Sequence, residues 1–269
     1  MTTDADNVPR NCSASALARL VPCLLLQDRK LVKTVRFARP AYVGDPINAV
    51  RIFNEREVDE LAILDINATP QAKSPNFELI ETIVSEAFMP VAYGGGIRSV
   101  DDISRLFSIG VEKAVLATAA IENGHLLAEA VQMFGSQSIV ACLDIRKNLF
   151  GKYEAYTRCG THKQSASPME IVARFVGSGA GEVLINSIDR DGTMTGYDLK
   201  IIAEIAARVS VPVMACGGAG TLADAREAIR AGASSAAAGS MFVYHGKHRA
   251  VLINYPTSEH RQEAFEGKS

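Results

Sequence analysis

The stretch "GGIRSVDDISRLFSIGVEKAVLAT", residues 95–118, recurs in outline about half the chain later as "GGAGTLADAREAIRAGASSAAAGS", residues 217–240. Each copy opens with a glycine pair, continues with an amphipathic segment and ends in a short run of small apolar residues. A glycine stands where a helix C-cap glycine belongs, at Gly110 in the first copy and at Gly232 in the second. The repeat therefore predicts one structural unit used twice.

The start of the predicted helix is also marked in both copies. Ser99 precedes Asp102 by three residues, and Thr221 precedes Asp224 by the same spacing. A hydroxyl residue followed three positions later by an acid is typical of a helix N-cap. The two copies therefore agree at the beginning and at the end of their helices.

Short apolar runs alternate with helical patterns along the rest of the chain. Eight strands that alternate with helices indicate parallel βαβ units, and a chain of 269 residues fits a single (β/α)8 barrel built from two fused half-barrels. Strands are expected near 20–26, 61–67, 89–93, 113–117, 138–144, 182–187, 211–216 and 235–239, with helices between them, for example at 98–109, 169–178, 198–208 and 222–231.

The barrel is expected over 17–256, with a loose tail at 1–16 and a C-terminal tail at 257–269.

The composition excludes several classes of protein. A net charge of −2 gives no general attraction to nucleic acid, and no apolar run reaches the length of a membrane-spanning helix. The polar N-terminus lacks the layout of a secretory signal, and the five cysteines form no CxxC pair. We expect reduced thiols, a cytoplasmic location, and neither metal nor cofactor.

Small residues follow the expected strands at corresponding places in the two halves. Ligands of such barrels bind at the C-terminal ends of the strands, where small residues let a phosphate reach backbone N–H groups. Two such sites on opposite sides of one mouth predict a ligand with two phosphates, although glycines used only for tight turns are the alternative. The residues concerned are Gly95, Gly96, Ala117, Thr118, Gly217, Gly218, Gly239 and Ser240.

Three acids stand at the ends of other apolar strands, namely Asp65, Asp144 and Asp191. Each is a candidate general acid or base, and each could instead cap a loop. The strand "VACLDIR", which contains Asp144, matches "VPCLLLQD" at the start of the first half, where Leu25 takes the place of the acid. Asp28 follows three residues later and is expected in the loop.

Four charged residues precede strands at the opposite end of the expected barrel. They are Arg19, Glu60, Lys113 and Glu182, which stand before the first, second, fourth and sixth strands. Their charges cancel, as expected for a mutually paired ring at the bottom of the barrel. A solvated rim is the alternative reading of the same spacing.

Several longer motifs are distributed over the chain from about Arg19 to Phe242. They are "VPCL", "GDP" at 44–46, "DELAILDI" at 59–66, "YGGGI" at 93–97, "FGSQSIV" at 134–140, "GAGEVLINSIDRDGT" at 179–193, "GYD" at 196–198 and "CGGAG" at 216–220. Over this range the chain resembles HisF, the cyclase subunit of imidazole glycerol phosphate synthase. The resemblance implies a (β/α)8 barrel whose top face binds a bis-phosphate small molecule and whose bottom face docks a HisH-like glutaminase. Ammonia made by the glutaminase would pass through the barrel to the top.

The resemblance assigns roles to individual residues. Asp144 matches one of the two catalytic aspartates of the family, and Leu25 stands in place of the other, so that cyclase activity is in doubt. Lys33, in the mobile loop after the first strand, is retained, and Asp191 remains as an acid at the mouth. Ala117 departs from a polar residue that usually helps to hold phosphate. Five positions still fit phosphate binding, namely Gly96, Thr118, Gly218, Gly239 and Ser240, and the four bottom charges match the salt-bridged gate at the ammonia entrance, which replaces the solvated-rim reading.

Four further stretches are "CLLLQDRKLVKTVRF", "YVGDPINAVRIFNEREVDEL", "KNLFGKYEAYT" and "GSMFVYHGKHRAVLINYP". They resemble a subset of HisF-like proteins, the acetamidino-modification paralogs found with surface-polysaccharide genes. This likeness implies an ammonia-channelling subunit that serves an ATP-dependent N-acetyl sugar amidotransferase. A cyclase in histidine biosynthesis and a non-catalytic activator of the glutaminase are the alternatives. The segment "HGKHRAVLINYP" is either a docking surface for the third protein or the last helix packing on the barrel.

Overall fold

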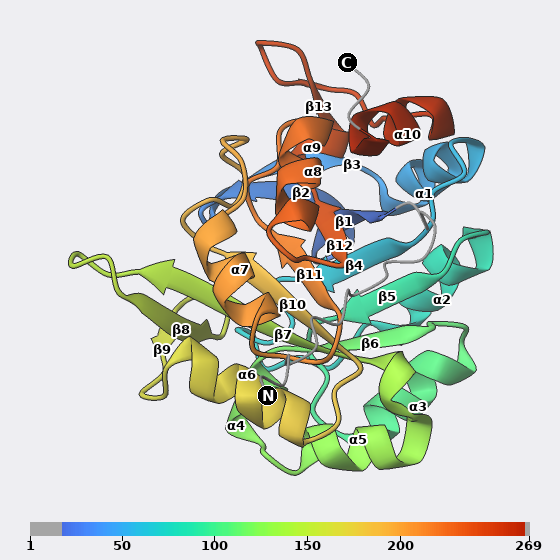
Figure 1. The fold of residues 1–269 in the computed structure, drawn as a ribbon. Helices are drawn as coiled ribbons and strands as arrows, with labels where there is room; N and C mark the ends of the chain where they lie inside the picture. The colour runs from blue at the N-terminus through green and yellow to red at the C-terminus, as the bar shows by residue number, and fades with distance from the viewer. Residues whose placement is uncertain (1–17, 267–269) are drawn as a thin grey trace, which may run out of the picture.

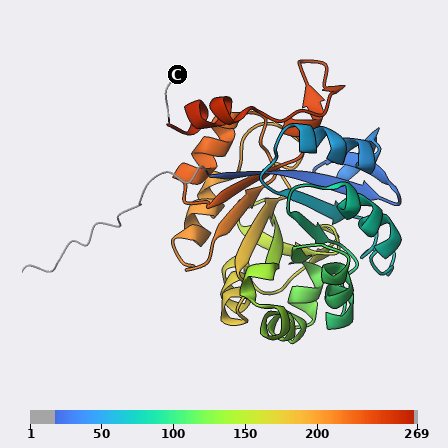
Figure 2. The same cartoon turned by 90° about the vertical axis from the view of Figure 1, so that its right-hand side faces the viewer.

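The computed structural model describes residues 18–266, and the expected tail at 1–16 lies outside these residues. Eight parallel strands close into a barrel with helices around it (Figures 1 and 2). The ring closes where β12 pairs with β1 and where β10 pairs with β7, which confirms the predicted (β/α)8 barrel. The barrel strands are β1 (Arg19–Gln27), β4 (Leu61–Asp65), β5 (Val91–Gly94), β6 (Lys113–Leu116), β7 (Ile139–Lys147), β10 (Glu182–Ser187), β11 (Val213–Cys216) and β12 (Ser235–Ala238).

The helices that alternate with these strands begin and end as the repeat predicts. Ser99 and Thr221 each form a capping box with the acid three residues on. Gly110 and Gly232 follow the helix ends with φ of 100° and 106°, a conformation that favours glycine. The helices are α1 (Pro46–Glu55), α2 (Phe77–Glu86), α3 (Val100–Ser108), α4 (Thr118–Glu122), α5 (Leu126–Phe134), α6 (Pro168–Gly177), α7 (Leu199–Ala206), α8 (Leu222–Arg230), α9 (Ser240–Val243) and α10 (Ser258–Glu266), with one 3₁₀ turn at Ser136–Ser138.

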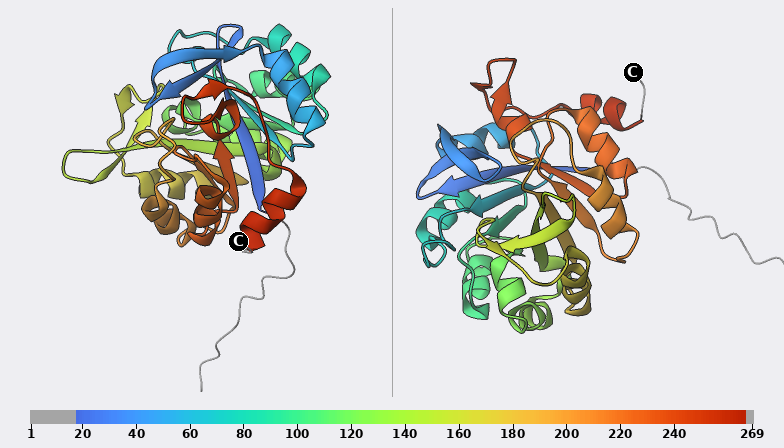
Figure 3. Two further views of the ribbon diagram at one scale, coloured as in Figure 1. Left: turned by 90° about the horizontal axis from the view of Figure 1, so that it is seen from above. Right: turned by 90° about the vertical axis from the view of Figure 1, so that its left-hand side faces the viewer.

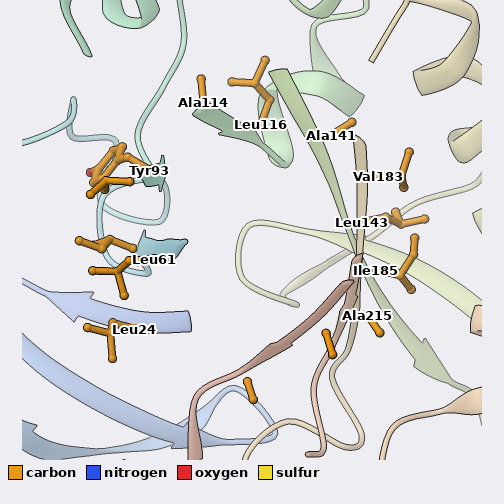
Figure 4. Packing of buried hydrophobic residues seen from close by; sticks show 14 of the residues in the cluster. Leu24, Leu61, Tyr93, Ala114, Leu116, Ala141, Leu143, Val183, Ile185 and Ala215 are labelled. Carbon is orange, nitrogen blue, oxygen red and sulfur yellow. The ribbon is translucent and has the colours of Figure 1, made fainter. Parts of the chain in front are cut away.

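Alternation along the strands divides the core into two layers. Outward-facing side chains such as Leu24, Leu61 and Ile185 form one buried cluster with apolar residues of the helices, and Figure 4 shows part of it. Inward-facing side chains form a separate apolar cluster that fills the barrel, as expected for strands with a period of two. This inner cluster consists of Val21, Cys23, Ala62, Ala92, Val115, Val140, Cys142, Leu184, Met214, Cys216 and Ala237.

The first strand of each half-barrel runs into an antiparallel extension that the sequence did not predict. After β1, the strands β2 (Lys30–Val35) and β3 (Ala38–Gly44) form a hairpin. After β7, the strands β8 (Tyr153–Thr157) and β9 (His162–Lys163) do the same. In Figure 3 the blue β2–β3 hairpin and the yellow-green β7–β8 hairpin project from the barrel. Lys33, expected in a mobile loop, therefore lies in strand β2.

The C-terminal segment "HGKHRAVLINYP" contains no helix, so the expectation of a last helix packing on the barrel is wrong for these residues. Its first part belongs to a short hairpin of β13 (Tyr244–His245) and β14 (Ala250–Val251), and the rest is extended chain. Within the stretch expected as a tail, α10 packs beside α8. Among the described residues, no helix is long and apolar enough to cross a membrane.

Candidate functional site

The C-terminal ends of the barrel strands surround a cavity of about 320 Å³. Its walls include inward-facing residues from the strand ends and parts of the β2–β3 and β8–β9 hairpins. Asp65, Asp144 and Asp191, expected from sequence at the mouth, all line it, as does Leu25. The sequence-predicted acids thus share one concave site at the top of the barrel, the usual location of ligand sites in this fold.

Asp144 lies on the inner face of β7, next to Asn186 on β10. Asn186 Nδ2 donates a hydrogen bond of 3.2 Å to Asp144 Oδ1. Burial raises the pKa of Asp144 to about 7, with a further contribution from the nearby carboxylate of Asp191, while the hydrogen bond from Asn186 opposes the rise. Asp144 is therefore able to give or take a proton near neutral pH.

Leu25 occupies the corresponding place on β1 and presents hydrocarbon to the same cavity. Asp28 lies in the turn after β1 with φ of 57°, in the loop where the sequence placed it. Its exposed carboxylate is near Lys73, at 4.0 Å, and accepts a long hydrogen bond from Asn67. Asp28 is absent from the cavity wall and does not replace the missing acid.

Asp191 binds the β2–β3 hairpin through both of its carboxylate oxygens. Lys33 Nζ lies 2.7 Å from Oδ1, and Thr34 Oγ1 donates to Oδ2 at 2.8 Å. All three residues are buried. Gly192 allows the close contact, because a Cβ there would lie 2.1 Å from the carbonyl oxygen of Thr34. In this conformation Asp191 and Lys33 hold the hairpin against the loop after β10.

The side chain of Asp65 caps the loop that follows β4. Its Oδ1 accepts hydrogen bonds from the backbone N–H groups of Asn67 and Ala68, at 2.9 and 3.0 Å. Burial raises the pKa of Asp65, and these two hydrogen bonds oppose the rise. The loop-capping alternative therefore accounts for the geometry of this residue.

The positions expected to bind phosphate all line the cavity, together with Ala117. Several of them are also required by the fold itself. A Cβ on Gly218 would lie 2.2 Å from the carbonyl oxygen of Gly196, and one on Gly96 would lie 2.8 Å from that of Lys73. Tight chain packing is thus sufficient to explain these two glycines, whatever they bind.

The two hydroxyls of this group differ in their surroundings. Thr118 Oγ1 accepts a hydrogen bond from the backbone N–H of Arg158, on the turn between β8 and β9. Ser240 Oγ is buried and has no hydrogen-bond partner among the described residues. Because a buried hydroxyl without a partner is unfavourable, Ser240 is the member of the group whose geometry most favours a bound ligand.

At the bottom of the barrel the four predicted charges meet in a closed ring. Arg19 contacts Glu60 and Glu182 at 2.5 Å each, and Lys113 contacts the same two acids at 2.9 and 3.3 Å. Both glutamates are buried, and Ser235 donates a further hydrogen bond to Glu182. Each acid thus touches both cations, an arrangement that compensates charges taken out of water. The apolar inner cluster fills the barrel between this ring and Asp144.

Two residues of the mouth were not found from the sequence. Asn186 reads as one more member of the buried strand "EVLINS", and only the strand register shows that it lies beside Asp144. Cys159, on the turn between β8 and β9, adopts a φ of 54° and donates through Sγ to the carbonyl oxygen of Ile66. Asn186 falls within the motif at 179–193, but neither residue was singled out as a candidate for the site. The four described cysteines are free thiols, and the described residues contain no His, Cys, Asp and Glu cluster suited to a metal ion.

Comparisons with known proteins agree with this architecture. A family model described as histidine biosynthesis protein matches residues 19–249. The chain is 51% identical over 239 residues to the "Putative imidazole glycerol phosphate synthase subunit hisF2" of Pseudomonas aeruginosa, covering 88% of this chain and 95% of that protein. It is 46% identical over 251 residues to the corresponding "hisF3" of Vibrio vulnificus, covering 93% and 96%.

A third relative carries the same name without a number or qualifier. The imidazole glycerol phosphate synthase subunit HisF of Alkaliphilus metalliredigens is 36% identical over 228 residues, which cover 84% of this chain and 90% of that protein. The match therefore extends over nearly the whole barrel in both chains. On these grounds the chain belongs to the HisF family of histidine biosynthesis proteins.

Proposed function

We propose that this chain is the ammonia-conducting subunit of a glutamine-dependent amidotransferase and serves a separate enzyme that amidates a sugar. The single observation that carries the proposal is the contrast between the two ends of the barrel. The ring of Arg19, Glu60, Lys113 and Glu182 is complete. At the mouth, Leu25 stands in place of one of the two catalytic aspartates that the resemblance to the family implies. A cyclase needs both acids, whereas a conduit needs only the entrance and the passage.

The bottom ring supports a glutaminase partner at that face. The relatives above are named as subunits, which fits a chain that works in a complex. Transient separation of Lys113 from the two glutamates would admit a molecule the size of ammonia, because Lys113 holds each of them only through its terminal amino group. Beyond the ring, the apolar interior offers few groups to protonate ammonia or to bind it on its way.

Exposed apolar side chains on the top face favour a second partner there, the acceptor enzyme that would receive the ammonia. Leu149 and Phe150, in the turn between β7 and β8, are fully exposed. The β7–β8 hairpin extends beyond the barrel (Figure 1). Neighbouring large apolar side chains that are exposed together favour a protein interaction site. In the full proposal the acceptor is an ATP-dependent N-acetyl sugar amidotransferase, the product is an acetamidino sugar of a surface polysaccharide, and the complex works in the cytoplasm.

The second candidate is the cyclase subunit of imidazole glycerol phosphate synthase in histidine biosynthesis. The names of the relatives favour it, and so does Asp144, whose pKa near 7 suits proton transfer. The unpartnered hydroxyl of Ser240 would suit a phosphate of its substrate. Against it stands Leu25, because loss of one placed general acid or base lowers a rate by roughly 10²–10⁴-fold.

The deciding experiment supplies the purified chain and its HisH-like glutaminase with glutamine and the ribonucleotide substrate of imidazole glycerol phosphate synthase. We expect stimulated glutamine hydrolysis without imidazole glycerol phosphate. Formation of that product at roughly 1 per second, typical of enzymes, would overturn the proposal. Leu25→Asp serves as the matched variant, since it restores the acid at an otherwise unchanged mouth. Stimulated hydrolysis without transfer of nascent ammonia to the sugar enzyme would favour a purely regulatory subunit instead.

A further inference from the structure

The side-chain carbonyl of Asn186 is a buried acceptor without a donor. The residue is 8% exposed, and its Oδ1 has no hydrogen-bond partner among the described residues. Its Nδ2 is used, because it donates to Asp144 Oδ1. A buried acceptor left unpaired costs about 1–3 kcal/mol. The arrangement is therefore complete only when something with a hydrogen to donate lies next to Oδ1.

The orientation of the amide follows from its neighbour. Asn186 and Asp144 are register partners on the adjacent strands β10 and β7. An ionised carboxylate accepts hydrogen bonds only, so the amide turns its NH₂ group toward Asp144 and its oxygen away. With the amide reversed, two acceptor oxygens would face each other. The free oxygen of Asn186 is thus a consequence of the charge that Asp144 carries when ionised.

Space beside this oxygen depends on Gly217. Gly217 has a φ of 87°, and a Cβ built there would lie 2.9 Å from Asn186 Oδ1 and 2.6 Å from the carbonyl oxygen of Ser187. Any other residue would place its Cβ against the acceptor. Asn186, Asp144 and Gly217 all line the cavity at the top of the barrel. A ligand that fits here places an N–H or O–H donor next to Asn186 Oδ1.

Asp144 and Asn186 lie directly above the apolar inner cluster of the barrel. Two residues earlier on the same strands, Cys142 and Leu184 belong to the apolar inner cluster. Asp144 and Asn186 are therefore the first polar side chains that β7 and β10 present above the apolar section. A molecule that moves up the interior from the charged ring meets them as it leaves that section.

We propose that Asp144 and Asn186 form an ammonium-binding site at the exit of the barrel interior. Ammonium has four N–H donors and no acceptor, so it satisfies Asn186 Oδ1 and the Asp144 carboxylate together. Neutral ammonia that reaches a protonated Asp144 takes its proton, which leaves a carboxylate and an ammonium ion side by side. The proton returns to Asp144 when ammonia departs, so the cycle is balanced. The proposed function enters here only as the source of the ammonia.

Other titratable groups near Asp144 affect its pKa. Asp191 contributes a nearby negative charge and is itself paired with Lys33 on β2. Cys142 lies two residues earlier on the same strand. Cys159 approaches from the turn between β8 and β9, and burial raises its pKa to about 12, so it stays neutral at the pH of interest. Bound ammonium stabilises the ionised form of Asp144 and therefore lowers its pKa.

The test follows the side-chain carboxyl of Asp144 by NMR in the full chain labelled with ¹³C-aspartate, with Asp144→Asn to assign the signal. Its pKa is measured in ammonium chloride, in sodium chloride and in tetramethylammonium chloride at equal ionic strength. We expect ammonium alone to lower the pKa in a saturable way, by about 1 if the ionised form binds it tenfold more tightly. Tetramethylammonium is the key control because it has the same charge and no N–H donor.

Equal pKa values of Asp144 in the three salts would overturn the site and leave water as its occupant. This holds also if all three values lie below the value at low ionic strength, because such a decrease is a general effect of salt. In Asn186→Leu the Asp144 signal should still titrate, while the response to ammonium is lost. The outcome is independent of the proposed function, because no partner is present. A specific ammonium response in a chain that proves to be a cyclase would retain this site and remove the sugar-amidating role.

Discussion

Leu25 on β1 and Asp144 on β7 face one cavity from equivalent places in the two half-barrels. Each stands near the end of a nine-residue strand that continues into an antiparallel partner, where Leu25 pairs with Val32 and Asp144 pairs with Tyr156. One half therefore brings a group that can carry a proton, and the other brings a hydrocarbon. The chemistry of the mouth is asymmetric although its framework repeats.

The first prediction concerns the stability of the fold against pH. Burial raises the pKa of Asp144 to about 7 from an ordinary value near 4, so the folded protein holds a proton that the unfolded chain releases between these values. Stability should therefore fall as pH rises from about 4 to about 7. Asp144→Asn removes the effect, and the variant should gain stability over the native chain across this window, by at most about 4 kcal/mol above pH 7.

Urea unfolding at pH 4.5 and pH 8 measures this difference. The gain should be smaller than the upper limit because the carboxyl faces a cavity rather than a sealed core. Asp101, an exposed acid in the first turn of α3, provides the matched control, and Asp101→Asn should leave the pH profile unchanged. An Asp144→Asn variant with no gain at pH 8 would show that the carboxyl is effectively solvated.

The second prediction concerns the charged ring. Lys113→Met leaves Glu60 and Glu182, both buried, with Arg19 as their remaining cationic partner in the ring. Breaking a buried ion pair by removing one partner is strongly destabilising, and we expect a loss of about 3 kcal/mol in the free energy of unfolding. Urea unfolding at neutral pH measures it.

The matched control for the ring is an ion pair on the surface. Arg230 contacts Glu227 at 3.1 Å on the exposed side of α8. Arg230→Met should change stability far less, because exposed pairs contribute little. Similar losses of unfolding free energy in the two variants would mean that the ring is hydrated and stabilises the barrel no more than a surface ion pair does.

The third prediction separates the two faces of the barrel. Leu149 and Phe150 are 101% and 95% exposed at the top, and Phe88, 87% exposed, lies between α2 and β5 at the bottom. If the proposed function holds, the double variant Leu149→Ser and Phe150→Ser should weaken binding of the proposed acceptor enzyme and spare the proposed glutaminase. Phe88→Ser should do the reverse. Pull-down with each purified partner measures both, and each variant is the control of the other.

Because all three side chains are exposed, neither variant should lose stability, and a change in binding reports on the surface itself. If the double variant bound the acceptor enzyme as well as the native chain does, the β7–β8 tip would have no part in docking. A loss of binding to both partners by either variant would contradict the division into two faces.

The repeat in the sequence was sufficient to predict the barrel, because each local signal agreed with the fold. The capping boxes at Ser99 and Thr221 begin their helices where expected, and the glycines after α3 and α8 end them. The charged ring followed from the same logic, since residues at the starts of parallel strands meet at one end of a barrel. In these parts of the chain, short-range patterns determine long-range contacts.

The remainder depends on contacts that no short pattern records. Lys33 and Thr34 are polar residues in the middle of β2, and their buried side chains find a hydrogen-bond partner in Asp191, far away in sequence. Asn186 reads as part of an apolar strand, and its free oxygen depends on a register partner and on a glycine from a third strand. The amphipathic patterns used for the barrel helices contain no such information.

The last prediction concerns α10, which replaces most of the segment expected from sequence to be a C-terminal tail. The helix lacks an apolar stripe, which explains why periodicity did not find it. Of its described side chains Arg261 is buried, and Phe265 is partly buried against the core. Arg261 forms an ion pair with Asp59 and a hydrogen bond with the hydroxyl of Tyr255, which in turn donates to the carbonyl oxygen of Leu20 on β1.

Asp59 and Leu20 are direct neighbours of the ring residues Glu60 and Arg19, so the C-terminal helix is fastened beside the bottom of the barrel. Deletion of residues 258–269 should therefore lower the free energy of unfolding by several kcal/mol, since it removes a buried cation from its partners. Arg261→Met, which keeps the helix and much of the side-chain volume, should reproduce a large part of the loss. Urea unfolding of both variants measures this, and a truncated chain as stable as the full one would show that the segment is a dispensable tail.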